Sequence, residues 1–237
     1  MINTWKHEVL YMKYSKKYRS ILLLVVGLTL FFTIYLGLSQ NNLDNQVMKN
    51  IFEQFRPIYW IICMYMMTDL LSTDYHSKTL KNNIWKTTRG VYLLSKVSLA
   101  SLACLFLLLV HFVTSWAFLN VAGSGVSFTM YQPFWLLVGA NLSLLFFATI
   151  LAFIMTLFEN ESVVIGVAIG MTLVVFIIES LDGRLAMYLP TMLLITLENM
   201  RKTELVTTSF VLVSYFSLAF LLFLGTIKLI DRKDIYI

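Results

Sequence analysis

The sequence predicts an all-α polytopic membrane protein with six transmembrane helices, an N-terminal amphipathic interfacial helix and a re-entrant helical stretch before the last span. Composition is the first reason: 59% of the 237 residues are hydrophobic, 13% are charged and the mean hydropathy is +0.78. A soluble domain carries about 25% charged residues, so an integral membrane protein is indicated. The other two reasons are the grouping of apolar residues into runs and the placement of Lys and Arg between those runs.

The chain contains six runs without a charged residue, and each is a candidate span of a single transmembrane domain, residues 1–237. A helix needs about 20 residues to cross the hydrocarbon core, with a range of about 17–25. The second and fifth runs are short for this, so we expect ragged ends there. The runs are residues 21–38, 57–68, 97–122, 133–158, 162–178 and 205–227.

Apolar side chains recur at helical spacing within residues 2–20. The stripe consists of Ile2, Trp5, Val9 and Met12. This pattern beside basic residues predicts an amphipathic helix on the inner leaflet. Lys13 and Lys16 interrupt the stripe, so we expect a bend into the first span there. A basic anchor with no mechanical role is the alternative. The apolar run starts late and no small-x-small cleavage site follows it, so no cleavable signal is expected.

Lys and Arg set the expected orientation, because loops rich in them stay in the cytoplasm. With six spans, thirteen of them fall on the side of both termini and five on the other side. Both termini are therefore predicted to be cytoplasmic. The net charge of +5 is then a topology signal and weak evidence for nucleic-acid binding.

The uncharged stretch at residues 185–197 is not counted as a span. It has Pro190 near its centre and is too short to cross the membrane comfortably. A seventh span would also place the basic tail outside. We expect a re-entrant or interfacial element within an extracellular region, residues 180–204.

The basic stretch at residues 74–96, after the second run, is the most informative part of the sequence. Its apolar positions at spacings of four and seven are Leu80, Ile84 and Val91. The basic residues are Lys78, Arg89 and Lys96 on roughly the opposite side, with Lys81 and Lys86 on the flanks. Asp74 and Ser77 are the expected N-cap residues. Such a helix is too polar for lipid and is expected to lie under the membrane and contact a partner.

Polar residues inside a span are candidates for function because they are costly to bury. His111 and Asn141 are of this kind. For both we favour a structural hydrogen bond to a neighbouring helix over substrate contact. His111 with Ser115, one turn later, is the pair that an intramembrane hydrolase would require. No third group that would orient the imidazole is visible in the sequence.

Two pairs of residues around the fifth span are further candidates for partner contact and helix packing. Glu159 and Glu161 belong to a short inner turn. This turn is either a solvated hairpin that ends two helices or a second contact with a cytoplasmic partner. Gly166 and Gly170 allow close helix approach, so the fifth span is the expected packing surface, within the chain or across a dimer. The sequence has no Gly-x-x-x-x-Gly-Lys-Ser/Thr, so ATP hydrolysis by that mechanism would need another protein.

The order of these elements resembles the type-2 family of ABC transporter permeases. In that family, the loop after span two holds an acid, Gly-Thr, a hydrophobic-basic stretch, an Arg before a hydrophobic run and a closing Lys. The corresponding residues are Asp74, Thr79-Leu80-Lys81, Arg89, Val91-Tyr92-Leu93-Leu94-Ser95 and Lys96. Two departures are that aspartate replaces the more usual glutamate and that Lys78 stands where the family has glycine.

The resemblance implies that residues 74–90 form a coupling helix that inserts into a separate cytoplasmic ATP-binding subunit. That subunit would bind ATP and Mg, while this chain would be no enzyme and would hold no cofactor or metal. A second permease, identical or related, would complete the transporter. The implied coupling residues are Asp74, Thr79, Leu80, Lys81, Ile84, Trp85, Lys86, Arg89 and Lys96, with Leu80, Ile84 and Trp85 as buried anchors.

The expected cargo is a hydrophobic or amphipathic peptide, exported across a bacterial cell membrane. Aromatic spans suit such cargo, and small members of the family resemble exporters of antimicrobial or cytolytic peptides and self-immunity pumps. The aromatic residues are Phe106, Phe112, Trp116, Phe118, Phe146, Phe147 and Phe153. The alternatives are a non-transporting scaffold or sensor that binds a partner through residues 74–96 and, more remotely, the hydrolase. A secondary transporter would need paired ionisable groups, and we interpret its lone acidic candidate, Asp69, as the polar end of span two.

Overall fold

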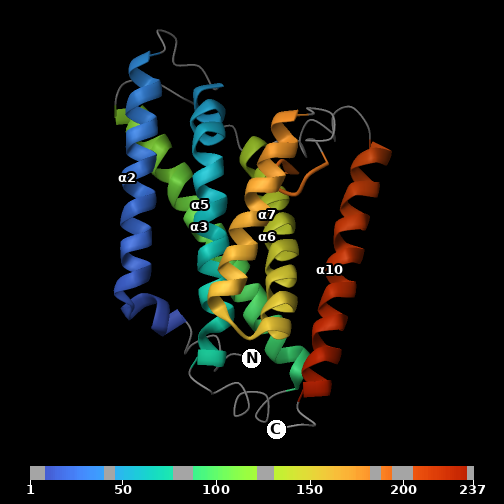
Figure 1. Ribbon diagram of the computed structural model, residues 1–237. Coiled ribbons are helices and arrows are strands. Elements are labelled where there is room, and N and C mark those ends of the chain that lie inside the picture. Colours follow the sequence, from blue (N-terminus) through green and yellow to red (C-terminus); the bar gives the residue numbers. More distant parts are fainter. Residues whose placement is uncertain are drawn as a thin grey trace.

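The computed structural model describes residues 9–39, 46–76, 88–121, 131–181, 188–193 and 205–233. These residues form six long helices with no strand among them, which confirms the all-α prediction (Figure 1). The helices are α2 (Lys16–Ser39), α3 (Gln46–His76), α5 (Arg89–Val121), α6 (Tyr131–Phe158), α7 (Glu161–Leu181) and α10 (Leu205–Lys233).

Consecutive helices run in opposite directions along one bundle (Figure 1). We call the end at which α2 and α5 begin and α10 finishes the proximal end, and the opposite end the distal end. α10 lies at one side of the bundle and packs on α6 and α5. The described starts and ends of the helices therefore alternate between two faces, as expected for a polytopic membrane protein.

Five helices are long and apolar enough to cross a membrane, namely α2, α5, α6, α7 and α10. This indicates a multi-pass membrane protein. α3 is outside this set, and its sequence is interrupted by the ionisable residues Glu53, Arg56 and Asp69. The predicted count of six spans therefore depends on α3.

α3 nevertheless lies at the centre of the bundle, where it contacts α2, α5, α6 and α7. At about 1.5 Å per residue, its 31 residues extend about 46 Å, which exceeds the hydrocarbon thickness of about 30 Å. Its side chains form much of the core, which places the most polar of the six helices away from lipid. The largest of those that are almost fully buried are Ile51, Phe52, Phe55, Tyr59, Trp60, Met64, Met67 and Leu70.

Two helices extend well beyond the predicted runs. α3 occupies Gln46–His76 although its uncharged run covers residues 57–68, and α5 begins at Arg89 although its run begins at residue 97. The charged residues that bounded the runs lie within these helices and pair with neighbouring helices. Charge alone was therefore a poor marker of where each helix ends.

The turn between α6 and α7 is as short as predicted. Glu159 has a φ of 52°, in the left-handed region that residues at helix C-termini often adopt. The side-chain oxygen of Asn160 accepts a hydrogen bond from the N–H of Ser162 at 3.0 Å, and so caps α7. These local contacts stop one helix and start the next with only two residues between them.

A short helix at residues 9–14 precedes α2, and the non-helical Ser15 separates the two. The break falls between Lys13 and Lys16, where the sequence predicted a bend. In Figure 1 this short segment turns away from the axis of α2. Its Met12 packs against the core of the bundle. That the segment lies on the inner leaflet stays a prediction.

Candidate functional site

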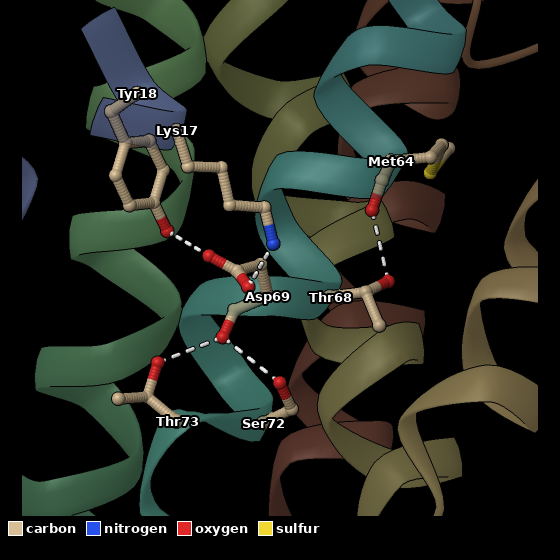
Figure 2. A network of polar contacts seen from close by, with 7 residues as sticks. All are labelled: Lys17, Tyr18, Met64, Thr68, Asp69, Ser72 and Thr73. Carbon is tan, nitrogen blue, oxygen red and sulfur yellow. Dashed lines mark hydrogen bonds and ion pairs between the residues drawn. The ribbon is translucent and has the colours of Figure 1, made fainter. Parts of the chain in front are cut away.

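At the proximal end, Asp69 of α3 contacts the beginning of α2 (Figure 2). Lys17 forms an ion pair with one carboxylate oxygen of Asp69, and the hydroxyl of Tyr18 donates to the other. Asp69 and Tyr18 are buried, while the Lys17 side chain is 33% exposed. Both oxygens of this buried carboxylate therefore have a partner, as a charge removed from water requires.

Further contacts hold this pair in place. The ammonium of Lys17 lies 4.5 Å from the ring centre of Tyr65, one turn before Asp69 on α3. The hydroxyls of Ser72 and Thr73 donate to the main-chain oxygen of Asp69 at 3.0 and 2.8 Å (Figure 2). The last turns of α3 thus satisfy their own polar groups and offer the Asp69 carboxylate to α2.

α5 contacts the next residue of α3. Lys96 is only 2% exposed, and its ammonium donates to the main-chain oxygen of Leu70 at 3.4 Å. The sequence placed Lys96 on the basic side of a coupling helix, but the structure buries it against α3. The reason is that α5 begins at Arg89, so Lys96 lies two turns inside a packed helix. We refer to Lys17, Tyr18, Asp69 and Lys96 as the proximal polar cluster.

Arg89 links the start of α5 to the end of α10. Its guanidinium lies 2.5 Å from a carboxylate oxygen of Asp231, and the two side chains are 39% and 46% exposed. One turn earlier on α10, Ile227 packs against Gly90, where an added Cβ would lie 3.5 Å from the Ile227 side chain. The chain immediately after residues 77–87 is therefore fastened to α10.

Most of the predicted coupling residues lie outside the described residues: Thr79, Leu80, Lys81, Ile84, Trp85 and Lys86. The described flanks are α3, which continues through Asp74 to His76, and α5, which begins at Arg89. Asp74 is therefore part of α3 and is not the N-cap residue that we predicted. Its place inside a continuing helix follows from the extension of α3 beyond the apolar run.

At the distal end, Arg56 of α3 pairs with Glu179 of α7 at 3.0 Å, with side-chain exposures of 13% and 5%. The guanidinium also lies 5.5 Å from the ring centre of Phe176 and donates to the sulfur of Met192. The hydroxyl of Thr191 donates to the second carboxylate oxygen of Glu179. This distal ion pair joins two helices to residues 188–193, the described part of the predicted re-entrant region.

An apolar groove of about 920 Å³ lies between α6, α7 and α10. Two of the polar side chains in its wall are engaged within the protein: Tyr215 donates to the main-chain oxygen of Tyr188 at 2.6 Å, and Ser214 to that of Phe210 at 2.8 Å. The groove therefore offers a hydrocarbon surface. Representative lining residues are Phe146 and Phe147 of α6, Gly170 and Val174 of α7, and Leu218 of α10.

His111 of α5 is buried against α2 and α3. Its Nδ1 is 2.8 Å from the hydroxyl of Thr29, and its ring stacks on Phe55 with centroids 4.3 Å apart. Ser115 instead accepts a hydrogen bond from Thr33 at 3.4 Å. The predicted structural hydrogen bond of His111 is confirmed, and its partner is a hydroxyl on α2, not a carboxylate.

The other candidates are dispersed over the bundle. Asn141 is half-buried on α6, while Glu159 is exposed and Glu161 half-exposed at the proximal turn. A Cβ added to Gly166 or Gly170 would meet nothing within 4 Å, so α7 makes no close approach at either glycine to the described part of the chain. Packing across a second copy stays a prediction. Among the described residues, no group of three His, Cys, Asp or Glu side chains could hold a metal ion.

No family model, curated protein or solved structure matches this chain. The geometry therefore has to carry the functional argument.

Neither of the two ion pairs of α3 was predicted from the sequence. Asp69 was interpreted as the polar end of span two, and neither Arg56 nor Glu179 was considered as a site residue. The signal that could have revealed these pairs is the depth of each charged residue along its span. Antiparallel neighbours bring the start of one span beside the end of another, so opposite charges at matching depths are candidate partners.

Proposed function

We propose that the chain is the transmembrane permease subunit of an ATP-driven exporter in a bacterial cell membrane. The carrying observation is that both flanks of residues 77–87 are fastened into the bundle. On one flank, α3 is joined to α2 through Asp69 and Lys17. On the other, α5 is joined to α10 through Arg89 and Asp231. A push on the segment between them would reach two helices on each side.

The proposal takes α3 as the second of six spans. Its length and central position support this, as does the pairing of its ionisable residues Arg56 and Asp69 with neighbouring helices. Charges inside a membrane helix are tolerated when they face the bundle and are paired. In this topology the proximal end is cytoplasmic, with both termini there and residues 180–204 outside, as the Lys and Arg distribution favours.

Coupling would require a cytoplasmic ATP-binding subunit that grips residues 74–90, and a second permease, identical or related, to complete the transporter. Glu159 and Glu161 lie at the same end of the bundle and would offer that subunit a second contact. Within this proposal Lys96 holds α5 against α3 and does not touch the partner, because it is buried. The chain itself does no chemistry, and ATP and Mg belong to the partner.

The proposed cargo is a hydrophobic or amphipathic peptide. Support comes from the groove of about 920 Å³, whose size lies within the range of ligand pockets and whose wall is apolar. Phe146 and Phe147, two of the aromatic residues noted in the spans, line it. Other aromatic residues, such as Phe106, are exposed on the outside of the bundle and suit contact with lipid.

The test is reconstitution of the full chain with the ATP-binding subunit that co-purifies with it. We expect amphipathic helical peptides to stimulate ATP hydrolysis and to move across the vesicle membrane. Reversing the charges of Lys81 and Lys86 should abolish both partner binding and flux. The matched control reverses Lys13 and Lys16, which carry the same charge at the same end but lie outside residues 74–96.

Two outcomes would replace the proposal. If a partner binds through residues 74–96 and no ATP-dependent flux follows, the chain is a scaffold or sensor. If ATP hydrolysis is absent and proteolytic activity is lost in His111→Ala, it is an intramembrane hydrolase. Co-purification of no ATP-binding protein, with residues 77–87 labelled from the outside of intact cells, would refute the exporter directly.

A further inference from the structure

Residues 188–193 form a short turn in the chain between α7 and α10 (Figure 1), and side chains of four different helices bond to it. Arg56 of α3 donates to Met192, and Ser143 of α6 donates to the main-chain oxygen of Pro190 at 2.5 Å. The remaining two ties come from α7, where Glu179 accepts from Thr191, and from α10, where Tyr215 donates to Tyr188. We call residues 188–193 the strap.

The strap is also a wall of the apolar groove. Tyr188 and Pro190 line the groove, whereas Thr191 faces the distal ion pair. Leu193 is fully buried against Leu142 of α6 and Val211 of α10. One short turn therefore separates a hydrocarbon surface from a buried charge pair, and it bridges the two helices, α6 and α10, that flank the groove.

The ties of the strap differ in kind from ordinary helix packing. All four are polar, and three of them use main-chain or side-chain oxygens of the strap. Within the strap, the N–H groups of Met192 and Leu193 donate to the oxygen of Leu189, and the described residues there form no helix or strand beyond this turn. A segment with little internal structure is held by its external contacts, so it opens locally when they are lost.

We propose that the strap is a gate at the distal end of the groove and that the hydrogen bond from Thr191 to Glu179 keeps it shut. Opening separates Thr191 from the carboxylate of Glu179 and lifts Leu193 from its apolar site. It also moves Tyr188 and Pro190 away from the groove, so that the groove is uncovered at this end. The Arg56–Glu179 pair remains intact during this motion, and the strap binds to it again when the gate closes. The gate is independent of the exporter proposal, because every part of it lies within this chain.

The experiment uses Leu193→Cys as a reporter in the full chain in lipid nanodiscs, with a membrane-impermeant maleimide as the probe. Cys63 and Cys104 are buried, and the chain without the reporter gives their background labelling. Thr191→Val removes the hydroxyl that bonds to Glu179 and should speed labelling by at least about tenfold, the lower end of the range expected for one hydrogen bond to a charged group. Thr191→Ser keeps the hydroxyl and should label at the original rate.

The matched control is Thr172→Val, which removes a hydroxyl that is as fully buried as that of Thr191 but lies within α7. Thr172 donates to the oxygen of Ala168 within its own helix, so it has no tie to the strap. The proposal is overturned if Thr191→Val labels no faster than Thr191→Ser, or if Thr172→Val speeds labelling equally. Hydrogen exchange at the amides of Met192 and Leu193, which needs no cysteine, replaces the reporter if Leu193→Cys does not fold. Faster exchange in Thr191→Val alone supports the gate, and equal exchange refutes it.

Discussion

The two ends of the bundle hold ion pairs of similar chemistry in different surroundings. At the distal end, Arg56 and Glu179 are 13% and 5% exposed, while at the proximal end Arg89 and Asp231 are 39% and 46% exposed. The Lys17–Asp69 pair lies between these extremes. Water screens an exposed pair, whereas a buried pair that loses one partner leaves a charge that nothing solvates. Exposure therefore separates a pair that fixes the fold from pairs that can part and re-form.

This difference agrees with the division of labour that we propose. The distal pair anchors the centre of the bundle and the strap, so it has to survive each cycle. The proximal pairs flank the segment that would receive the push of an ATP-binding subunit, so they have to pass it on to α2 and α10 and adjust at low cost as these helices move. Four substitutions measure this gradient, in order of expected effect.

The strongest test removes one side of the distal pair. Glu179→Gln should lower the free energy of unfolding by about 3–5 kcal/mol, because the charge of Arg56 stays buried without its partner. The measurement is denaturant-induced unfolding in micelles. The double variant Arg56→Gln with Glu179→Gln should be more stable than either single variant, since it buries no unpaired charge. Single losses below about 1 kcal/mol would mean that water reaches this pair.

An intermediate loss is expected for the proximal carboxylate. Asp69→Asn keeps the shape of the side chain but removes the charge that Lys17 and Tyr18 contact, and it should cost about 1–3 kcal/mol. The loss is smaller than for Glu179 because Lys17 is partly solvated. Lys17→Met should lower stability by a similar amount. Lys16 is the exposed neighbour of Lys17, and Lys16→Met should leave stability unchanged. Equal effects of the two lysine substitutions would contradict the assigned pairing.

These two regions also show what the sequence could predict. The helical class, the bend before the first span and the short turn at Asn160 follow from hydropathy and from local capping, which act over a few residues. The partners of Asp69 and Glu179 lie 52 and 123 positions away, so no local pattern reveals them. The same non-local pairing lets α3 and α5 extend past the charges that the sequence analysis used as their ends.

The candidate site also contains features that the sequence could predict and features that it could not. Lys96 could not be placed from the sequence, because its burial depends on where α5 begins and on how α5 packs against α3. The groove likewise forms between three helices that contribute ordinary apolar residues, and none of these residues is unusual in its own span. His111 was more predictable, because a polar residue in the middle of a span has few options other than a hydrogen bond to a neighbour.

A neutral polar contact in the bundle interior refines the comparison. Thr29→Val removes the hydroxyl that bonds to Nδ1 of His111 and should cost about 0.6–1.7 kcal/mol, the range of hydrogen bonds between membrane helices. Thr226→Val is the control, because the partner of the Thr226 hydroxyl among the described residues is the oxygen of Leu222 in its own helix. A cost above about 3 kcal/mol would show that burial alone, without charge, explains the strength of the distal pair.

The smallest effect is expected where the pair is most exposed. Asp231→Asn should change the free energy of unfolding by about 0–1 kcal/mol, and the change should shrink further at high salt, because ions screen exposed charges. The effect of Arg89→Gln on the free energy of unfolding includes more than the ion pair, since Arg89 makes other contacts besides Asp231. A double-mutant cycle separates the pair from those contacts. Arg232→Gln, at an exposed neighbour of Asp231, controls for net charge. A coupling energy as large as that of the Arg56–Glu179 pair would remove the gradient on which the proposed cycle depends, because a proximal end held that firmly could not adjust as the helices move.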